Sequence, residues 1–160
     1  MPNWTLAERA YELPRDIALL DTNVLVALIN PHDDWHDHTV AALDLGEYSW
    51  AVTLPALIEA WNLLDGRERR TDLAYQLMSW VLTPGRAILL GDEIEPIDVA
   101  HSYSQRVGID FADRLSRACG FEPAVQIATY DTGDFLRLFG PGLSFNVYDM
   151  RNTSSTSDIA

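Results

Sequence analysis

The most constraining feature of this chain is a short apolar segment, residues 17–20, followed directly by Asp21, Thr22 and Asn23 and then by a second apolar segment, residues 24–29. The first segment has the length of a strand, and Thr22 and Asn23 are typical of a helix start. In open α/β sheets, ligands bind outside the carboxyl ends of the strands. Asp21 is therefore predicted to lie where such a sheet binds its ligand.

The rest of the chain alternates between strand-like and helix-like patterns. Strands are predicted at residues 17–20, 49–53, 86–90, 125–129 and 143–148. Helices are predicted at residues 3–13, 22–29, 32–45, 55–64, 71–82, 96–107, 110–120 and 132–138, with Gly108 ending one helix and Asp110 capping the next. Strands separated by helices indicate a three-layer α/β/α sandwich around a mostly parallel five-stranded sheet. We assign residues 17–150 to this domain, residues 1–16 to an N-terminal extension, and residues 151–160 to a disordered tail.

Composition narrows the class of protein. The 160 residues are 48% hydrophobic, which favours a single domain with a substantial core. The single cysteine, Cys119, excludes an internal disulfide framework and fits a reducing compartment. Neither a signal peptide nor a segment long enough to span a bilayer is recognisable, so we expect a soluble cytoplasmic protein without a membrane partner.

The charged residues exclude several functions. The formal net charge is −13, and all 11 basic residues are arginine. Without lysine there is no Walker-type nucleotide site, and receiver domains and haloacid-dehalogenase-like phosphotransferases also use a lysine beside the phosphoryl group. The acidity argues against a broadly basic nucleic-acid-binding surface. It is compatible with a metal site or an arginine-rich partner.

Five aspartates occupy positions at or near predicted helix starts. Asp21, Asp110 and Asp131 each precede a helix, where aspartate is a common N-cap. Asp113 and Asp134 come three residues after Asp110 and Asp131, where an acid can complete a capping box. Asp21 and Asp131 are the stronger functional candidates, because each follows an apolar strand directly.

Glu59 is harder to explain as a purely structural residue. It lies in residues 57–64, a helical segment in which only Glu59 and Asn62 are polar. A helix that is apolar on nearly all sides is buried, and a buried carboxylate needs a partner. The partner is either an arginine or a bound cation, and we favour the cation because the other acids converge on the same edge.

Taken together, the ordered pieces are Asp21-Thr22-Asn23, Glu59 on an apolar helix, Asp113 within residues 111–118, and Thr129-Tyr130-Asp131. This order and spacing resemble the PIN-domain family of metal-dependent ribonucleases, especially the VapC-type toxins, from about residue 17 to residue 148. The resemblance implies that the metal-binding and catalytic acids are Asp21, Glu59, Asp113 and Asp131. It also implies supporting roles for Asn23 and Thr129, to which we add Asp110 and Asp134.

The same resemblance implies the cofactor and the partners. The cofactor is Mg²⁺ or Mn²⁺, the substrate is RNA, and a small antitoxin protein restrains the activity; a homodimer is compatible with this scheme. Carboxylate oxygens are the ligands that these hard cations prefer. One or two such metals can activate water and stabilise charge during phosphodiester cleavage. The expected activity is therefore metal-dependent endoribonuclease cleavage.

Arginines are the candidate contacts to the RNA backbone, because they bind phosphate in a bidentate manner. The candidates are Arg67, Arg69, Arg70, Arg114 and Arg117. For the first three, neutralisation by nearby acidic residues is an equally good interpretation. His32, His36 and His38 are not assigned as metal ligands, because a zinc site needs four ligands and no further close His or Cys is at hand. The tryptophans are predicted to be core or dimer-contact residues.

A rival hypothesis is a catalytically inactive PIN-like module that serves as an interaction scaffold. The net charge of −13 supports this alternative, because it hinders the capture of RNA. An arginine-lined groove beside the acids would favour the enzyme.

Overall fold

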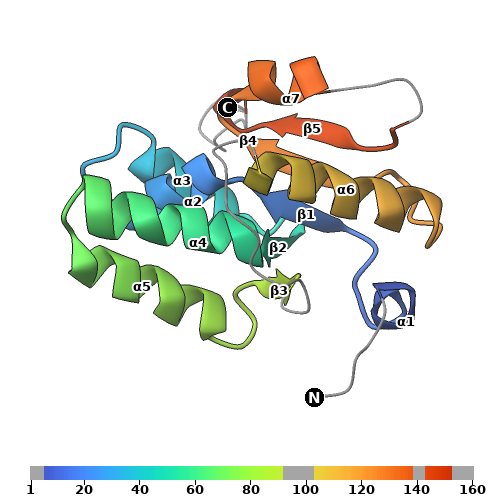
Figure 1. Ribbon diagram of the computed structural model, residues 1–160, viewed down its shortest axis with the longest axis horizontal. Helices are drawn as coiled ribbons and strands as arrows, with labels where there is room; N and C mark the ends of the chain where they lie inside the picture. Colours follow the sequence, from blue (N-terminus) through green and yellow to red (C-terminus); the bar gives the residue numbers. More distant parts are fainter. Residues whose placement is uncertain (1–5, 92–102, 139–142, 153–160) are drawn as a thin grey trace.

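A parallel five-stranded sheet forms the centre of the computed structural model, which describes residues 6–91, 103–138 and 143–152 (Figure 1). The strand order is β3-β2-β1-β4-β5, and every neighbouring pair is parallel. The strands are β1 (Ile17–Leu20), β2 (Ser49–Thr53), β3 (Ile88–Leu90), β4 (Gln126–Thr129) and β5 (Asn146–Asp149). The predicted α/β class and sheet are confirmed, and the sheet is parallel throughout.

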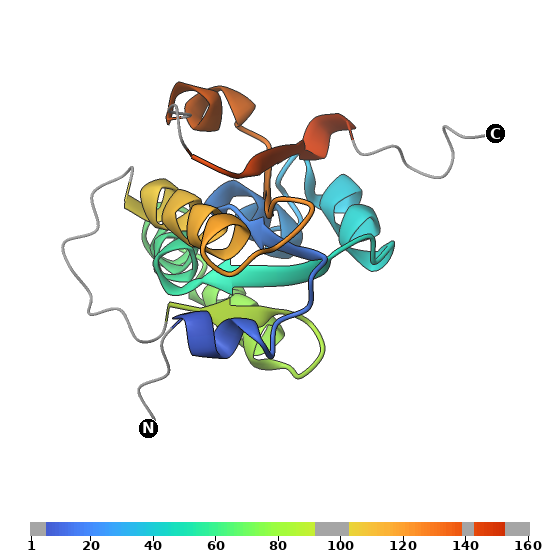
Figure 2. The ribbon, with the colours of Figure 1, turned by 90° about the vertical axis from the view of Figure 1, so that its right-hand side faces the viewer.

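Helices cover both faces of the sheet, which gives three layers (Figure 2). Helices α2 to α5 pack on one face, and α1 and α6 pack on the other. The helices are α1 (Leu6–Ala10), α2 (Thr22–Ile29), α3 (His36–Asp44), α4 (Leu54–Asn62), α5 (Thr71–Leu82), α6 (Tyr103–Arg117) and α7 (Thr132–Leu138). Helix α7 lies beyond β5 at the end of the sheet, and a short 3₁₀ turn, η2 (Met150–Asn152), follows β5.

Strand β1 shows how the sequence produces the two cores. Its four residues are all buried: Ala18 and Leu20 contribute to the core under α2–α5, while Ile17 and Leu19 contribute to the core under α6. A strand buried on both faces must be apolar throughout, which is why this segment carries no alternating pattern. Its carboxyl end is therefore the first position at which a polar residue, Asp21, is tolerated.

The boundary of α3 differs from the predicted one. The helix was expected to start at His32, but it starts at His36. Asn30 Oδ1 accepts a hydrogen bond from His32 N at 3.1 Å, and Asp33 Oδ1 accepts one from Trp35 N at 2.9 Å. These local side-chain bonds satisfy the backbone in turns and so delay the helix.

The prediction of a helix break at Gly108 is wrong, because α6 continues through it to Arg117. A glycine inside a helix costs about 1 kcal/mol relative to alanine. Val107, Ile109 and Phe111 are all buried around it, and burying one such side chain gains roughly 1.5–3 kcal/mol. Asp110 is consequently not a cap. It lies exposed within the helix, 3.5 Å from Arg114 Nη1. Residues 96–102 of the predicted preceding helix lie outside the described residues.

The N-terminal segment packs onto the domain. Ala10 and Leu13 are buried in the core beneath α6. Arg9 Nη2 donates a hydrogen bond of 2.7 Å to Leu89 O, which ties α1 to β3. Within the described ranges, no helix has the length and apolar character needed to cross a membrane.

Candidate acidic site at the carboxyl edge of the sheet

Asp21 stands directly after β1 and caps α2. Its Oδ1 accepts a hydrogen bond of 2.9 Å from Thr22 N, and its Oδ2 accepts one of 2.8 Å from Thr129 Oγ1. The residue is only 7% exposed. The expected position at the carboxyl edge of the sheet is therefore occupied by a buried carboxylate whose two oxygens are both oriented by neutral donors.

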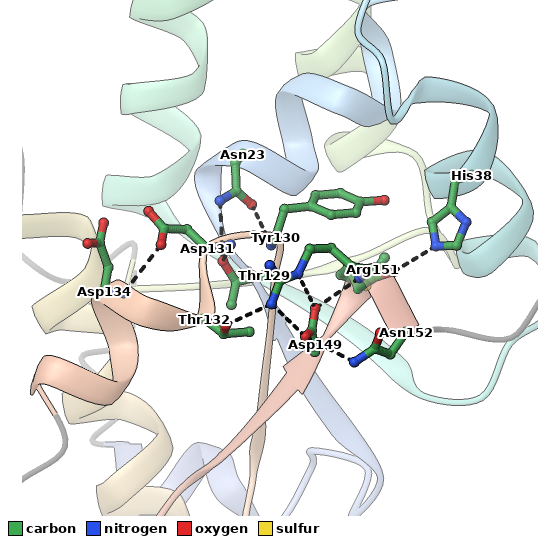
Figure 3. Close-up of polar contacts among 11 residues, drawn as sticks. Asn23, His38, Thr129, Tyr130, Asp131, Thr132, Asp134, Asp149, Arg151 and Asn152 are labelled. Carbon is green, nitrogen blue, oxygen red and sulfur yellow. Dashed lines mark hydrogen bonds and ion pairs between the residues drawn. The ribbon is translucent and has the colours of Figure 1, made fainter.

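Thr129 links Asp21 to the end of β4 (Figure 3). Besides donating to Asp21, its hydroxyl accepts hydrogen bonds from Asn23 Nδ2 at 3.2 Å and from Asp131 N at 2.9 Å. Asn23 Oδ1 in turn accepts from Tyr130 N at 3.2 Å. The Asp-Thr-Asn and Thr-Tyr-Asp pieces are thus joined by a continuous hydrogen-bond network, since β1 and β4 are neighbours in the sheet.

Glu59 reaches the same edge from α4. Its Oε2 accepts a hydrogen bond of 3.0 Å from Thr22 Oγ1 and a second one from Ser104 Oγ. Ser104 is 3% exposed and lies in the first turn of α6. Thr22 therefore touches both carboxylates, with its backbone N on Asp21 and its hydroxyl on Glu59. The sequence did not single out Ser104, because its place beside Glu59 depends on how α6 crosses α4.

Asp131 is the exposed member of the group. Its Oδ1 accepts a hydrogen bond of 3.3 Å from Asp134 N, so it also caps α7. Asp134 pairs with Arg137 and accepts a hydrogen bond of 3.3 Å from Gln105 Nε2. Asp131 therefore has two roles: it caps α7, as the sequence suggested, and it lies close enough to Asp21 for its charge to act there. Asp134 lies one helical turn further on.

The pKa of the buried Asp21 carboxyl group is strongly shifted. Its pKa is raised from 3.8 to about 6, chiefly by burial and to a smaller extent by the negative charges of Glu59 and Asp131. The hydrogen bonds from Thr129 and Thr22 N act in the opposite direction, because they stabilise the ionised form. A carboxyl group with this pKa is ionised at neutral pH only at a substantial free-energy cost. A bound cation would offset that cost.

Asp113 does not join the other acids. Its Oδ1 accepts a hydrogen bond of 2.6 Å from Ser144 N and lies 3.1 Å from Arg117 Nη2. Ser144 precedes β5, whose first residue pairs with the first residue of β4, so this contact is at the amino end of the strands. Asp113 also follows Ser104 by nine helical positions, a rise of about 13 Å along α6. The expectation that Asp113 shares a cation with Asp21 is therefore not met.

In the described part of the chain, His32, His36 and His38 are not gathered into a metal centre. His32 is exposed, whereas His36 Nδ1 lies 2.8 Å from Ala27 O and His38 Nε2 lies 2.6 Å from Met150 O. Among the described residues, no three or more His, Cys, Asp or Glu side chains are arranged to hold a metal ion. A cation at the acidic edge would therefore require Glu59 or Asp131 to reorient toward Asp21.

The arginines chosen from the sequence lie in two parts of the chain. Arg67 ends the π-helical turn η1 (Leu63–Arg67) that follows α4, and Arg69 and Arg70 come directly after it; Arg70 Nη2 is 2.9 Å from Asp72 Oδ2. Arg114 and Arg117 are near the carboxyl end of α6 and pair with the acids four residues before them. None of these five is placed beside Asp131 by any contact in the described part of the chain.

Arg151 is the arginine that the sequence analysis missed. It was assigned to the disordered tail, yet it lies in the η2 turn after β5. Its Nη2 donates to Thr132 Oγ1 at 3.1 Å, and the charge of Asp131 contributes to raising its pKa, after the larger effects of Asp149. Asp149 and Arg151 follow the predicted strand 143–148, but the contact of Arg151 with Thr132 cannot be read from either segment alone. The remaining tail residues, 153–160, lie outside the described residues.

Comparison with known proteins does not identify a relative. No protein-family model, curated protein or solved structure matches this chain.

Proposed function

We propose that this chain is a divalent-metal-dependent endoribonuclease whose site is built from Asp21, Glu59 and Asp131. The observation that carries the proposal is Asp21 itself: a buried carboxylate with a pKa raised to about 6, close enough to Glu59 and Asp131 to feel their charges. Groups with strongly shifted pKa values at the carboxyl edge of a sheet are typical of functional sites. The resemblance to PIN-domain ribonucleases suggests the reaction, which is hydrolysis of RNA phosphodiester bonds.

The donor set fits a hard cation. Asp21, Glu59 and Asp131 present carboxylate oxygens, which Mg²⁺ and Mn²⁺ prefer. A bound cation of this kind supplies a Lewis acid and an activated water for phosphodiester hydrolysis. Thr22, Thr129 and Ser104 hold Asp21 and Glu59 in place, while Asp131 is exposed and can rotate at little cost. In this proposal Asp113 is not a ligand.

Cleavage and metal response test the proposal together. Wild type should cut a structured RNA with Mn²⁺, should lose this activity with a chelator, and should melt at a higher temperature when Mg²⁺ or Mn²⁺ is added. Asp21→Asn should abolish cleavage and reduce the metal-induced rise in melting temperature. Asp16→Asn is the matched control, because Asp16 is exposed just before the opposite end of β1 and bonds only Ser49 in that region. Equal metal responses in wild type and Asp21→Asn would contradict the proposal.

The toxin half of a toxin–antitoxin pair is the biological role that the resemblance suggests. We propose a small antitoxin protein as the partner that restrains the nuclease. A short open reading frame beside this one, whose product forms a stable complex with the chain and blocks cleavage, is the expected finding. Failure of any co-encoded small protein to inhibit cleavage would contradict this part of the proposal.

A catalytically inactive scaffold is the second candidate. It is favoured by the position of Asp113 at the amino end of the strands, which leaves the acidic group one member short of the PIN pattern. Under this alternative, purified wild type neither cuts RNA nor responds to divalent cations. The same assay therefore separates the two candidates.

A further inference from the structure

An aromatic pair lies next to the acidic group. The rings of Trp35 and Tyr130 are stacked with centroids 4.8 Å apart and an interplanar angle of 21°. Tyr130 directly precedes Asp131, and its hydroxyl is 2.5 Å from Thr39 Oγ1, which holds the ring in position. Trp35 remains 38% exposed, although it is one of the largest apolar side chains. Trp35 is partly exposed, and it stacks on Tyr130, whose ring is held by Thr39. Trp35 therefore presents a rigid aromatic surface.

Arg151 is connected to this pair through Met150 and His38. The carbonyl oxygen of Met150 lies 2.6 Å from His38 Nε2, and the ring of His38 packs edge-on against both Trp35 and Tyr130. Figure 3 shows the hydrogen bonds from the guanidinium group of Arg151 to Asp149 and to Thr132, the residue that follows Asp131. Tyr130 adjoins Asp131 in the chain, and the charge of Asp131 acts on Arg151, so the aromatic pair and the guanidinium group both lie near Asp131.

The geometry of Arg151 leaves it able to bind an anion. Nε and Nη2 donate to Asp149, at 3.0 and 2.9 Å, which fixes the plane of the guanidinium group. Within the described residues Nη1 has no hydrogen-bond partner, and the side chain is 48% exposed. A guanidinium group that is held on one edge and open on the other can donate to a phosphate oxygen without first losing much conformational freedom.

We infer that Trp35, Tyr130 and Arg151 form a binding subsite for a nucleotide of single-stranded RNA, with a base stacked on Trp35 and a backbone phosphate on Arg151. The inference rests on the proposed function, because it is that function which brings an RNA strand to Asp131. Stacking on an exposed ring requires a base that is not already stacked in a duplex. The net charge of −13 repels RNA, so RNA binding requires a local positive charge near the bound phosphate. The guanidinium group of Arg151 supplies that charge.

Binding can be measured without cleavage. The probe is a fluorescein-labelled octamer of uridine. Its binding is measured by fluorescence anisotropy across a salt series with a chelator and no divalent metal, so that the metal-dependent cleavage cannot occur. An unlabelled duplex of the same length serves as the competitor. Cleavage of an unmodified RNA is recorded separately for each variant.

The Trp35 variants separate stacking from packing. Trp35→Leu keeps apolar bulk and removes the π surface, so the Kd for the octamer should rise about tenfold, within the range for losing one stacked base. Trp35→Phe should retain most of the affinity. Tyr75→Ala is the control, since Tyr75 is 65% exposed on α5 and its ring packs against Trp61, not against Trp35 or Tyr130. Its Kd should match wild type.

Arg151→Ala tests the phosphate contact. Its Kd should rise several-fold, and the slope of log K against log salt should become shallower by about 0.7, the value for one phosphate contact on a single strand. Arg86→Ala is the control, because Arg86 is exposed just before β3, at the amino end of the strands. Arg86→Ala should leave both affinity and slope unchanged.

The outcomes distinguish this inference from the proposed function. Loss of affinity in Trp35→Leu and Arg151→Ala but not in the controls supports the subsite, even if no RNA is ever cut; in that case the nuclease proposal alone fails. The inference is overturned if wild type does not bind the octamer, if the duplex competes as well as a single strand, or if both variants bind like wild type while cleavage proceeds.

Discussion

The hydroxyl of Thr129 donates a 2.8 Å hydrogen bond to Oδ2 of Asp21, which joins the carboxyl ends of β4 and β1. The same hydroxyl accepts from Asn23 Nδ2 and from Asp131 N. One buried side chain thus fixes the position of Asp21 and Asp131 relative to each other. It does so because parallel strands that are neighbours in a sheet end at the same edge.

Removing this hydroxyl should destabilise the fold and raise the pKa of Asp21. Thr129→Val deletes three hydrogen bonds at a buried position, and at about 1 kcal/mol each we expect a loss of about 2–3 kcal/mol. The pKa of Asp21 should rise because the bond that stabilises its ionised form is gone. Urea denaturation and an NMR titration of the Asp21 carboxyl carbon measure the two effects. Thr129→Ser keeps the hydroxyl and should leave the pKa near its original value; a pKa that is the same in the Val variant would contradict the argument.

The sequence was sufficient to predict this edge of the sheet. β1, β2, α5 and α7 have the predicted bounds. A fully apolar four-residue segment followed by polar residues predicts a buried strand that ends where the polar residues begin. Asp21 and Asp131 follow from the same pattern, as does their proximity once the two strands are parallel neighbours.

The course of α6 could not be predicted in the same way. Gly108 and Asp110 are local signals for a helix end and a helix start, and here the burial of Val107, Ile109 and Phe111 outweighs both. This long helix determines which of its residues meets Glu59, and that residue is Ser104. Arg151 was missed for a related reason: its contact with Thr132 joins segments 19 residues apart and is invisible in either one alone.

Stability should fall as Asp21 ionises. Its pKa is 3.8 in the unfolded chain and about 6 in the fold, so between these values the folded state holds a proton that the unfolded state has released. The unfolded state then binds fewer protons, and the free energy of unfolding decreases with rising pH across that interval, by up to about 3 kcal/mol. Above about pH 6 the full penalty is present. Urea denaturation from pH 3.5 to 8 without divalent metal should reveal this component.

Asp21→Asn should remove most of this pH dependence. The variant loses the ionisation penalty, but the amide replaces one of two accepting oxygens and forfeits about 1 kcal/mol of hydrogen bonding. The penalty is the larger effect, so at pH 7.5 the variant should be more stable than metal-free wild type by about 1–2 kcal/mol. Below pH 4 the order should reverse. A variant less stable than wild type at both pH values would show that Asp21 carries no such penalty.

The family resemblance and the structure disagree about the role of Asp113. The resemblance makes it a metal ligand, whereas the structure places it at the amino end of the strands against Ser144 N and Arg117. Asp113→Asn should therefore leave cleavage and the metal-induced rise in melting temperature at wild-type levels. Its only expected effect is a stability loss of about 0.5–1 kcal/mol, because an amide oxygen can still accept from Ser144 N but no longer pairs with a cation.

Asp131→Asn is the positive control for the Asp113→Asn experiment. Asp131 is exposed and lies with Asp21 at the carboxyl edge, so its loss should abolish cleavage and weaken the metal response while leaving the fold intact. RNA cleavage with Mn²⁺ and thermal melts with and without the metal are recorded for both variants in parallel. If Asp113→Asn instead loses cleavage as completely as Asp131→Asn and remains folded, then Asp113 acts at the site in solution. That result would require α6 to bring Asp113, in place of Ser104, to Glu59.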